Sequence, residues 1–177
     1  MLKYICGDIM NLLFTKLNKR VNVKEFYEIV DIEMNSGFIP YTESMILECI
    51  KYMDNFIVKD IDKDLIVGFI TIEENDYLYN NSNYIVNISV LPEYRRNGLA
   101  KGLILFACKY YQNMNSENIQ LTLDVNLDNK AIELYKKIGF EKLEMLSRNG
   151  KTDIVMGADI NKLIFNISKL VDFKMDI

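Results

Sequence analysis

A strand, a proline, a basic turn and a glycine-led helix follow one another directly in the middle of this 177-residue chain. Tyr84–Leu91 has the apolar, β-branched composition of a strand, and Pro92 ends it because proline has no backbone N–H to donate. The pair Arg95-Arg96 follows, and Gly98 lies at the start of a helix expected over Asn97–Asn113. The free N–H groups of a helix start attract anions, and glycine lets an anion approach the backbone closely. The segment therefore predicts an anion site between a strand and a helix.

Two common phosphate loops do not fit this segment. A P-loop requires G-x-x-x-x-G-K-[ST], and a dinucleotide-binding turn requires G-x-G-x-x-G directly after its strand, whereas residues 98–102 read G-L-A-K-G. A solvated arginine turn that only caps an amphipathic helix is the simpler alternative.

Hydrophobic periodicity predicts one domain of mixed α/β (α+β) class. Turn chemistry and strand order require both parallel and antiparallel pairing, which predicts a central, mixed, mostly antiparallel sheet flanked by helices. Besides the elements named above, we expect helices over 23–34, 42–53 and 129–138, and strands over 12–16, 56–60, 65–73, 119–125, 140–146 and 152–156. Residues 1–158 form the expected domain, and residues 159–177 an amphipathic helical tail that packs on it or on a second subunit as a homodimer contact.

The composition excludes much chemistry. The chain has no histidine, so a histidine base, a Ser-His-Asp triad and the histidine-containing zinc sites are ruled out. Its three cysteines are far apart, and its net charge is −4, so we expect no metal and no nucleic-acid partner. No stretch is long and apolar enough to span a membrane and no leader is evident, so we expect a cytoplasmic protein with no membrane partner.

Two motifs resemble those of a known family. Arg95-x-x-Gly98-x-Ala100 after Val90-x-Pro92 matches the pattern [QR]-x-x-G-x-[GA]. Residues 129–140 resemble the block N-x-x-A-x-x-L-Y-x-x-x-G-F, in the same order along the chain. The chain therefore resembles the GNAT N-acetyltransferases, over about residues 12–156.

The resemblance implies acetyl-CoA as a cosubstrate, and no metal. The cosubstrate's pantetheine arm would pair with the strand Ile88-Ser89-Val90, which in the family splays from its neighbour at a bulge. Asn129 would contact that arm, although Asn126 or Asp128 of the same shortened loop are alternatives. The pyrophosphate would lie on the turn that comprises Arg95, Arg96, Asn97, Gly98, Leu99 and Ala100.

The resemblance also implies catalytic residues. Tyr135 would protonate the leaving thiolate, unless it is only a core residue of its helix. Leu123-Asp124-Val125 resembles the L-E-V of RimI-like members, which acetylate N-terminal amines of ribosomal proteins. Asp124 would then be the base, directly or through water, because it is one methylene shorter than glutamate. Glu73 and Glu74 are reserve candidates.

The expected activity is that of an acyltransferase: direct attack of a primary amine on acetyl-CoA, with a protein N-terminus or a small amine as acceptor. Cys108 is not expected to carry the acetyl group, because it lies within the apolar body of a helix. The rival hypothesis is a non-catalytic acyl-CoA sensor. In the family that the chain resembles, the helices expected here over 23–34 and 42–53 wall the acceptor pocket. Both carry acidic residues, which favours a cationic acceptor unless these residues are simply solvated: Glu25, Glu28, Asp31, Glu33, Glu43 and Glu48.

Overall fold

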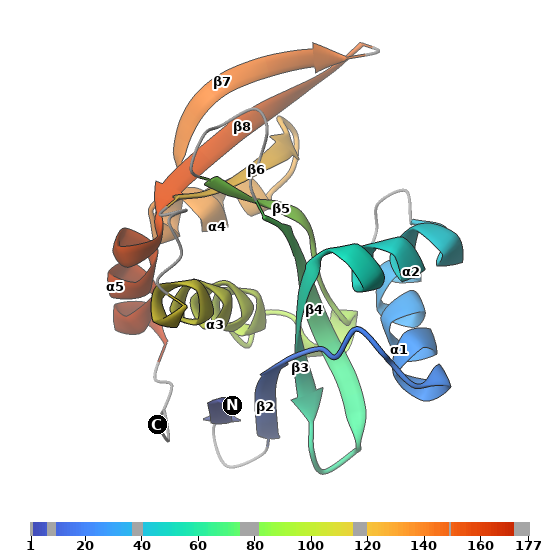
Figure 1. Ribbon diagram of the computed structural model, residues 1–177. Helices are drawn as coiled ribbons and strands as arrows, with labels where there is room; N and C mark the ends of the chain where they lie inside the picture. The colour runs from blue at the N-terminus through green and yellow to red at the C-terminus, as the bar shows by residue number, and fades with distance from the viewer. Residues whose placement is uncertain are drawn as a thin grey trace.

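An eight-stranded mixed sheet forms the centre of the computed structural model, which describes residues 2–6, 10–36, 41–74, 82–114, 120–148 and 150–171 (Figure 1). The strand order is β1-β2-β3-β4-β5-β6-β8-β7. The strands are β1 (Leu2–Cys6), β2 (Met10–Lys16), β3 (Asp54–Asp60), β4 (Leu65–Glu73), β5 (Ser82–Val90), β6 (Gln120–Asn126), β7 (Glu141–Arg148) and β8 (Lys151–Asp159). The helices are α1 (Val23–Met34), α2 (Glu43–Tyr52), α3 (Leu99–Asn113), α4 (Ala131–Ile138) and α5 (Ile160–Leu170), with a short 3-10 turn η1 (Pro92–Tyr94).

The predicted fold class is confirmed, with one correction at the N-terminus. All neighbouring strands pair antiparallel except β5 and β6, which are parallel because α3 crosses between them. The sequence analysis placed the first strand at residues 12–16, but β1 precedes it and pairs with β2. This five-residue strand carries too few residues for a clear alternating pattern. The predicted start of β6 at Ile119 lies outside the described residues.

The helices divide between the two faces of the sheet. α1 and α2 cover one face, where they contact β3, β4 and β5, and α3 covers the opposite face (Figure 1). Side-chain caps fix where the first two helices begin. Asn22 and Glu25 form a reciprocal capping box on α1, and Thr42 accepts a hydrogen bond from the backbone of Met45 in α2.

The sheet opens between its two parallel strands. β5 and β6 pair only over Ser82–Tyr84 and Gln120–Thr122. On its other side, β5 shifts register against β4, because Ile85 pairs with Ile72 whereas Asn87 pairs with Thr71. Val86 is the extra residue of this β-bulge, and a bulge bends the strand that carries it. Beyond Tyr84, the β6-facing edge of β5 therefore has no strand partner among the described residues.

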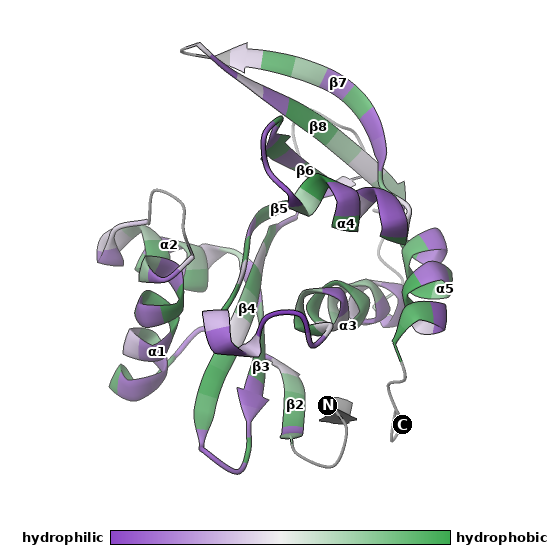
Figure 2. Cartoon of the chain, turned by 180° about the vertical axis from the view of Figure 1, so that it is seen from behind, coloured by the Kyte–Doolittle hydropathy of each residue, from purple (hydrophilic) through white to green (hydrophobic). Residues whose placement is uncertain are grey.

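The last helix packs on the chain itself. Ile160, Leu163 and Ile167 of α5 are buried, and the helix lies along α3. Figure 2 shows how hydrophobic and hydrophilic residues alternate along α5. The apolar stripe predicted for the tail is thus covered largely by its own domain, while Phe165 stays 60% exposed. No helix in the described ranges has the length and hydrophobicity needed to cross a membrane.

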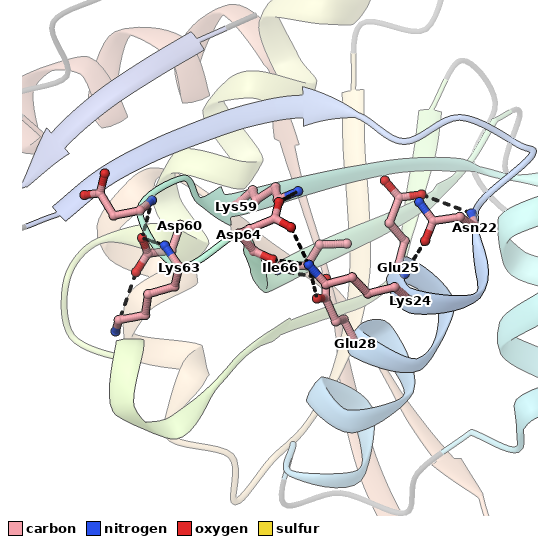
Figure 3. A network of polar contacts seen from close by, with 10 residues as sticks. Asn22, Lys24, Glu25, Glu28, Lys59, Asp60, Lys63, Asp64 and Ile66 are labelled. Carbon is pink, nitrogen blue, oxygen red and sulfur yellow. Dashed lines mark hydrogen bonds and ion pairs between the residues drawn. The ribbon is translucent and has the colours of Figure 1, made fainter.

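A polar network joins the β3–β4 hairpin to its surroundings (Figure 3). Asp64, in the left-handed region at φ 50°, pairs with Lys24 of α1 and with Lys59. On the other side of the hairpin, the buried carboxylate of Asp60 accepts a hydrogen bond of 2.7 Å from Tyr94 Oη. Burial by itself raises the pKa of Asp60, but the hydrogen bonds from Tyr94 and the hairpin backbone outweigh it and lower the pKa. The hairpin therefore holds η1, the turn from which the basic loop emerges.

We expect Tyr94→Phe to destabilise the fold by about 1–3 kcal/mol, because it removes a donor from a buried carboxylate. The pKa of Asp60 is lowered in the folded state, so its contribution is complete above about pH 4 and is lost as the pH falls through the folded pKa. Urea unfolding at several pH values measures this. The control Tyr52→Phe, at a 68% exposed site, should change little. Equal midpoints for both variants near pH 7 would contradict the assignment.

Candidate active site

The gap between β5 and β6 contains a pocket of about 300 Å³. It reaches both faces of the sheet, since Glu33 of α1 and Tyr41 line one side while Tyr135 of α4 lines the other. The bulge at Val86 supplies part of its wall. The remaining lining residues are Ile85, Asn87, Ile88, Leu123, Asp124, Val125, Asn126, Asn129 and Ala131. Several of the predicted site residues, which are separated in sequence, therefore meet in one cavity.

Tyr135 lies at the α4 side of the pocket. It is 7% exposed and packs edge-on against Phe140, with ring centroids 5.6 Å apart. Its hydroxyl makes no hydrogen bond to any described residue, and burial raises its pKa to about 12. The phenol therefore stays protonated across the neutral pH range, as a proton donor must. Core packing and a place in the pocket are both observed for this residue.

Asp124 lines the same pocket from β6. The strand alternates, so Leu123 and Val125 are buried in the core while Asp124 is exposed on the opposite face. Its Oδ1 accepts a hydrogen bond from Tyr84 Oη of β5. A carboxylate that is open to solvent, and that the Tyr84 hydroxyl helps to orient, can accept a proton directly or through water.

The polar residues of the shortened loop after β6 differ from one another in their hydrogen-bond partners. Asn126 is committed to the loop itself, because its amide donates to Thr152 O and Asp153 and its oxygen accepts from the backbone of Asp128. Asn129 Oδ1 accepts from the backbone N–H of Ala131 at 2.9 Å, which leaves Nδ2 without an acceptor among the described residues. Of the three alternatives considered, Asn129 is the one whose amide is a free donor at the pocket.

The predicted anion site borders a second pocket, of about 260 Å³, at the start of α3. Arg96 (φ 68°) and Gly98 (φ 80°) both adopt left-handed backbone conformations. Within the described structure, the backbone N–H groups of residues 96–101 have no acceptor. Successive free N–H groups at a helix start form a concave site for an anion. Leu134 of α4 also lines this pocket, next to the Tyr135 of the first.

The two arginines of the turn differ. Arg95 donates through Nε to Val90 O at 2.9 Å and through Nη2 to Asn35 O at 2.8 Å. Its guanidinium therefore ties the end of α1 to the end of β5. Arg96 makes no ion pair with a described residue, so its charge is available to an anion. Leu99 is buried, so only its backbone can contribute to the anion site.

The sequence analysis did not include the pocket carboxylate Glu33 among the catalytic or cofactor-binding residues. The sequence analysis grouped Glu33 with the acidic residues of the first two helices, yet it is only 3% exposed. Glu33 lies one helical turn beyond the buried Ile29, on the inner face of α1. This spacing was the sequence signal that could have predicted its burial. The reserve candidates Glu73 and Glu74 do not line this pocket.

Comparisons with known proteins point to one family. The model of the acetyltransferase (GNAT) family matches residues 23–140. A curated N-alpha-acetyltransferase of Saccharolobus solfataricus is 36% identical over 95 residues, which are 53% of this chain and 56% of that protein. The chain thus spans little more than half the length of this relative.

Solved structures share the fold. The ribosomal-protein-S18-alanine N-acetyltransferase of Escherichia coli has a TM-score of 0.67 and 20% identity, with 84% of this chain and 94% of that chain covered. Arabidopsis thaliana NAA60 in complex with acetyl-CoA has a TM-score of 0.68 and 21% identity, with 85% and 99% covered.

We expect Gly98→Ala to weaken the binding of coenzyme A by roughly tenfold or more, because the strained turn can no longer aim its N–H groups at one anion. Gly150→Ala is a matched control, since Gly150 also has a positive φ, of 74°, in a distant hairpin turn. Each variant should lose about 1–2 kcal/mol of stability from backbone strain. Calorimetry measures the affinity of each variant for coenzyme A, and equal affinities would contradict the assignment of the anion site.

Proposed function

Since the chain belongs to the acetyltransferase (GNAT) family, we propose that it transfers the acetyl group of acetyl-CoA to a primary amine. The observation that carries the proposal is the meeting of Tyr135 and Asp124 in a gap of the sheet, beside an anion site. The acceptor we favour is the α-amine of a peptide, the reaction for which the archaeal relative is named. A small amine is the second candidate acceptor. The cytoplasmic location and the homodimer remain predictions.

The residues present fit acetyl-CoA. The N–H groups of residues 96–101 suit its pyrophosphate, and Arg96 adds a positive charge. The free edge of β5, at Ile88, Ser89 and Val90, offers backbone partners to the amides of the pantetheine arm, as for an added strand. Asn129 Nδ2 offers one more donor near that arm. The thioester would then lie in the gap beside Tyr135.

The proposed reaction needs no covalent enzyme intermediate. The neutral amine attacks the thioester carbonyl carbon, a C–N bond forms and the C–S bond breaks. Asp124, directly or through water, takes the proton that the amine loses, and Tyr135 gives its hydroxyl proton to the leaving sulfur. A backbone N–H of the β5 edge would hold the carbonyl oxygen as negative charge develops on it.

The pKa of Tyr135 constrains the timing of proton transfer. Its pKa is about 12, whereas a thiol has an ordinary pKa of about 8.5, so full protonation of a free thiolate would be uphill by about 5 kcal/mol. The proton must therefore move in concert with cleavage of the C–S bond, so that collapse of the oxyanion intermediate drives the transfer to sulfur. Binding of the thioester also excludes water from both groups, which raises the pKa of the thiol as well.

Two alternatives, a non-catalytic sensor and a covalent acetyl carrier, are less well supported. A non-catalytic acyl-CoA sensor has no use for a buried phenol and a carboxylate facing one pocket. An acetyl carrier needs an accessible thiolate, but Cys108 is 1% exposed within α3 and burial raises its pKa strongly.

The proposal is tested by titrating the protein with acetyl-CoA in a calorimeter, with CoA and ATP as controls, and then by following thiol release with a panel of amines. We expect binding in the micromolar range, and turnover with at least one acceptor class. No binding at millimolar acetyl-CoA would overturn the proposal.

We expect Tyr135→Phe to lower kcat by about 10²-fold or more, with the affinity for acetyl-CoA unchanged. Because burial raises the pKa of Tyr135 to about 12, the wild-type kcat should not fall between about pH 8 and pH 10.5 through loss of this proton. Steady-state kinetics over that range checks both points. The exposed Tyr27→Phe serves as the control. An alkaline fall near pH 10 that disappears in Tyr135→Phe would contradict the buried-acid assignment.

A further inference from the structure

Glu33 has no part in the chemistry described above, although it lies in the same pocket. The residue is 3% exposed, and none of the described lysines or arginines lies within ion-pair distance of its carboxylate. Removal of a charge from water is costly unless an opposite charge or several hydrogen bonds compensate. This residue therefore has the features of a group whose counter-charge arrives with a ligand.

The carboxylate of Glu33 is held in a fixed orientation. Asn87 Nδ2 donates to its Oε2 at 2.6 Å, and the backbone N–H of Tyr41 donates to its Oε1 at 3.3 Å. Ser89 Oγ in turn donates to Asn87 Oδ1, at 3.3 Å, which fixes the amide so that its NH₂ group faces the carboxylate. These donors are neutral, so they orient the negative charge without cancelling it.

The described lining of the pocket carries two carboxylates, Glu33 and Asp124, and no lysine or arginine. Tyr41 lies close to both: burial, and then the charges of Cys49, Glu33 and Asp124, raise the pKa of its phenol. The pocket is therefore negative on this side, and negative clefts concentrate cations.

The direction of approach decides which substrate meets Glu33. The anion site and Tyr135 lie at the start of α3 and on α4, so the cosubstrate would occupy that face of the sheet. Glu33 and Tyr41 line the pocket from the opposite face, which α1 and α2 cover. The acceptor amine would therefore enter past Glu33.

We propose that Glu33 selects acceptors by pairing with a second cationic group, close to the amine that is acetylated. This inference rests on the proposed function. Asp124 is already assigned the proton of the reacting amine, so Glu33 is the carboxylate whose charge remains to be balanced. Both a small diamine and a peptide with a basic side chain next to its N-terminal residue have this chemistry.

Matched acceptor pairs test the proposal. One pair is 1,4-diaminobutane and 1-butylamine, and the other is a peptide with lysine at its second position and the same peptide with norleucine there. We expect wild-type kcat/KM to favour the dication of at least one pair by roughly tenfold or more. The two pairs distinguish a small-molecule acceptor from a peptide.

Glu33→Gln should abolish this preference, while its calorimetric affinity for acetyl-CoA stays unchanged. Glu48→Gln is a matched control with the same loss of charge on the exposed surface of α2, and it should keep the preference. Thermal unfolding of both variants, together with their acetyl-CoA binding, shows that each is folded.

A preference that persists in Glu33→Gln, or its absence from the wild-type protein in both pairs, would overturn the inference while leaving acetyl transfer intact. Absence of acetyl-CoA binding or of turnover with every acceptor counts instead against the proposed function. Calorimetric binding of 1,4-diaminobutane and the lysine peptide needs no turnover and decides the inference in that case. If the wild-type protein binds either ligand and Glu33→Gln does not, the inference is upheld. If the wild-type protein binds neither ligand, the inference is overturned.

Discussion

β5 and β6 exchange backbone hydrogen bonds over only three residues each, and the rest of the structure depends on this early end to their pairing. The bulge at Val86 bends β5 away from its neighbour while the opposite edge of β5 stays paired with β4. An unpaired strand edge inside a sheet leaves backbone donors and acceptors that some other group must satisfy. A substrate arm with its own amides fits that requirement, which is why the proposed function places the cosubstrate at this opening.

The groups around the opening are positioned by contacts outside it. Arg95 joins the end of β5 to the end of α1, so that the two walls of the pocket are connected on one side. The buried pair of Tyr94 and Asp60 fixes η1 on the β3–β4 hairpin. α4 ends at Gly139, whose φ of 114° lets the chain turn into β7 and keeps Tyr135 packed on Phe140. Each contact stabilises the fold and sets the direction of a functional group.

The sequence predicted elements and motifs better than it predicted side-chain partners. The bounds of α1 and β4 and the mixed sheet followed from local periodicity and turn chemistry, which act over a few residues. The burial of Glu33 could not be predicted in the same way. It depends on Asn87, which lies 54 residues away, and on how two strands diverge. From the sequence alone, a carboxylate on a helix is predicted to be solvated, because only tertiary packing can enclose it.

Residues from both faces of the sheet line the pocket, and this has a kinetic consequence for the proposed reaction of two substrates. In that reaction each substrate would approach from its own face, so neither one would block the path of the other. The proposed reaction would then allow the complex of both substrates to form in either order, and each product to leave by the side on which its precursor arrived. The sheet would thus separate the paths of the two reactants, which would meet at the gap beside Val86.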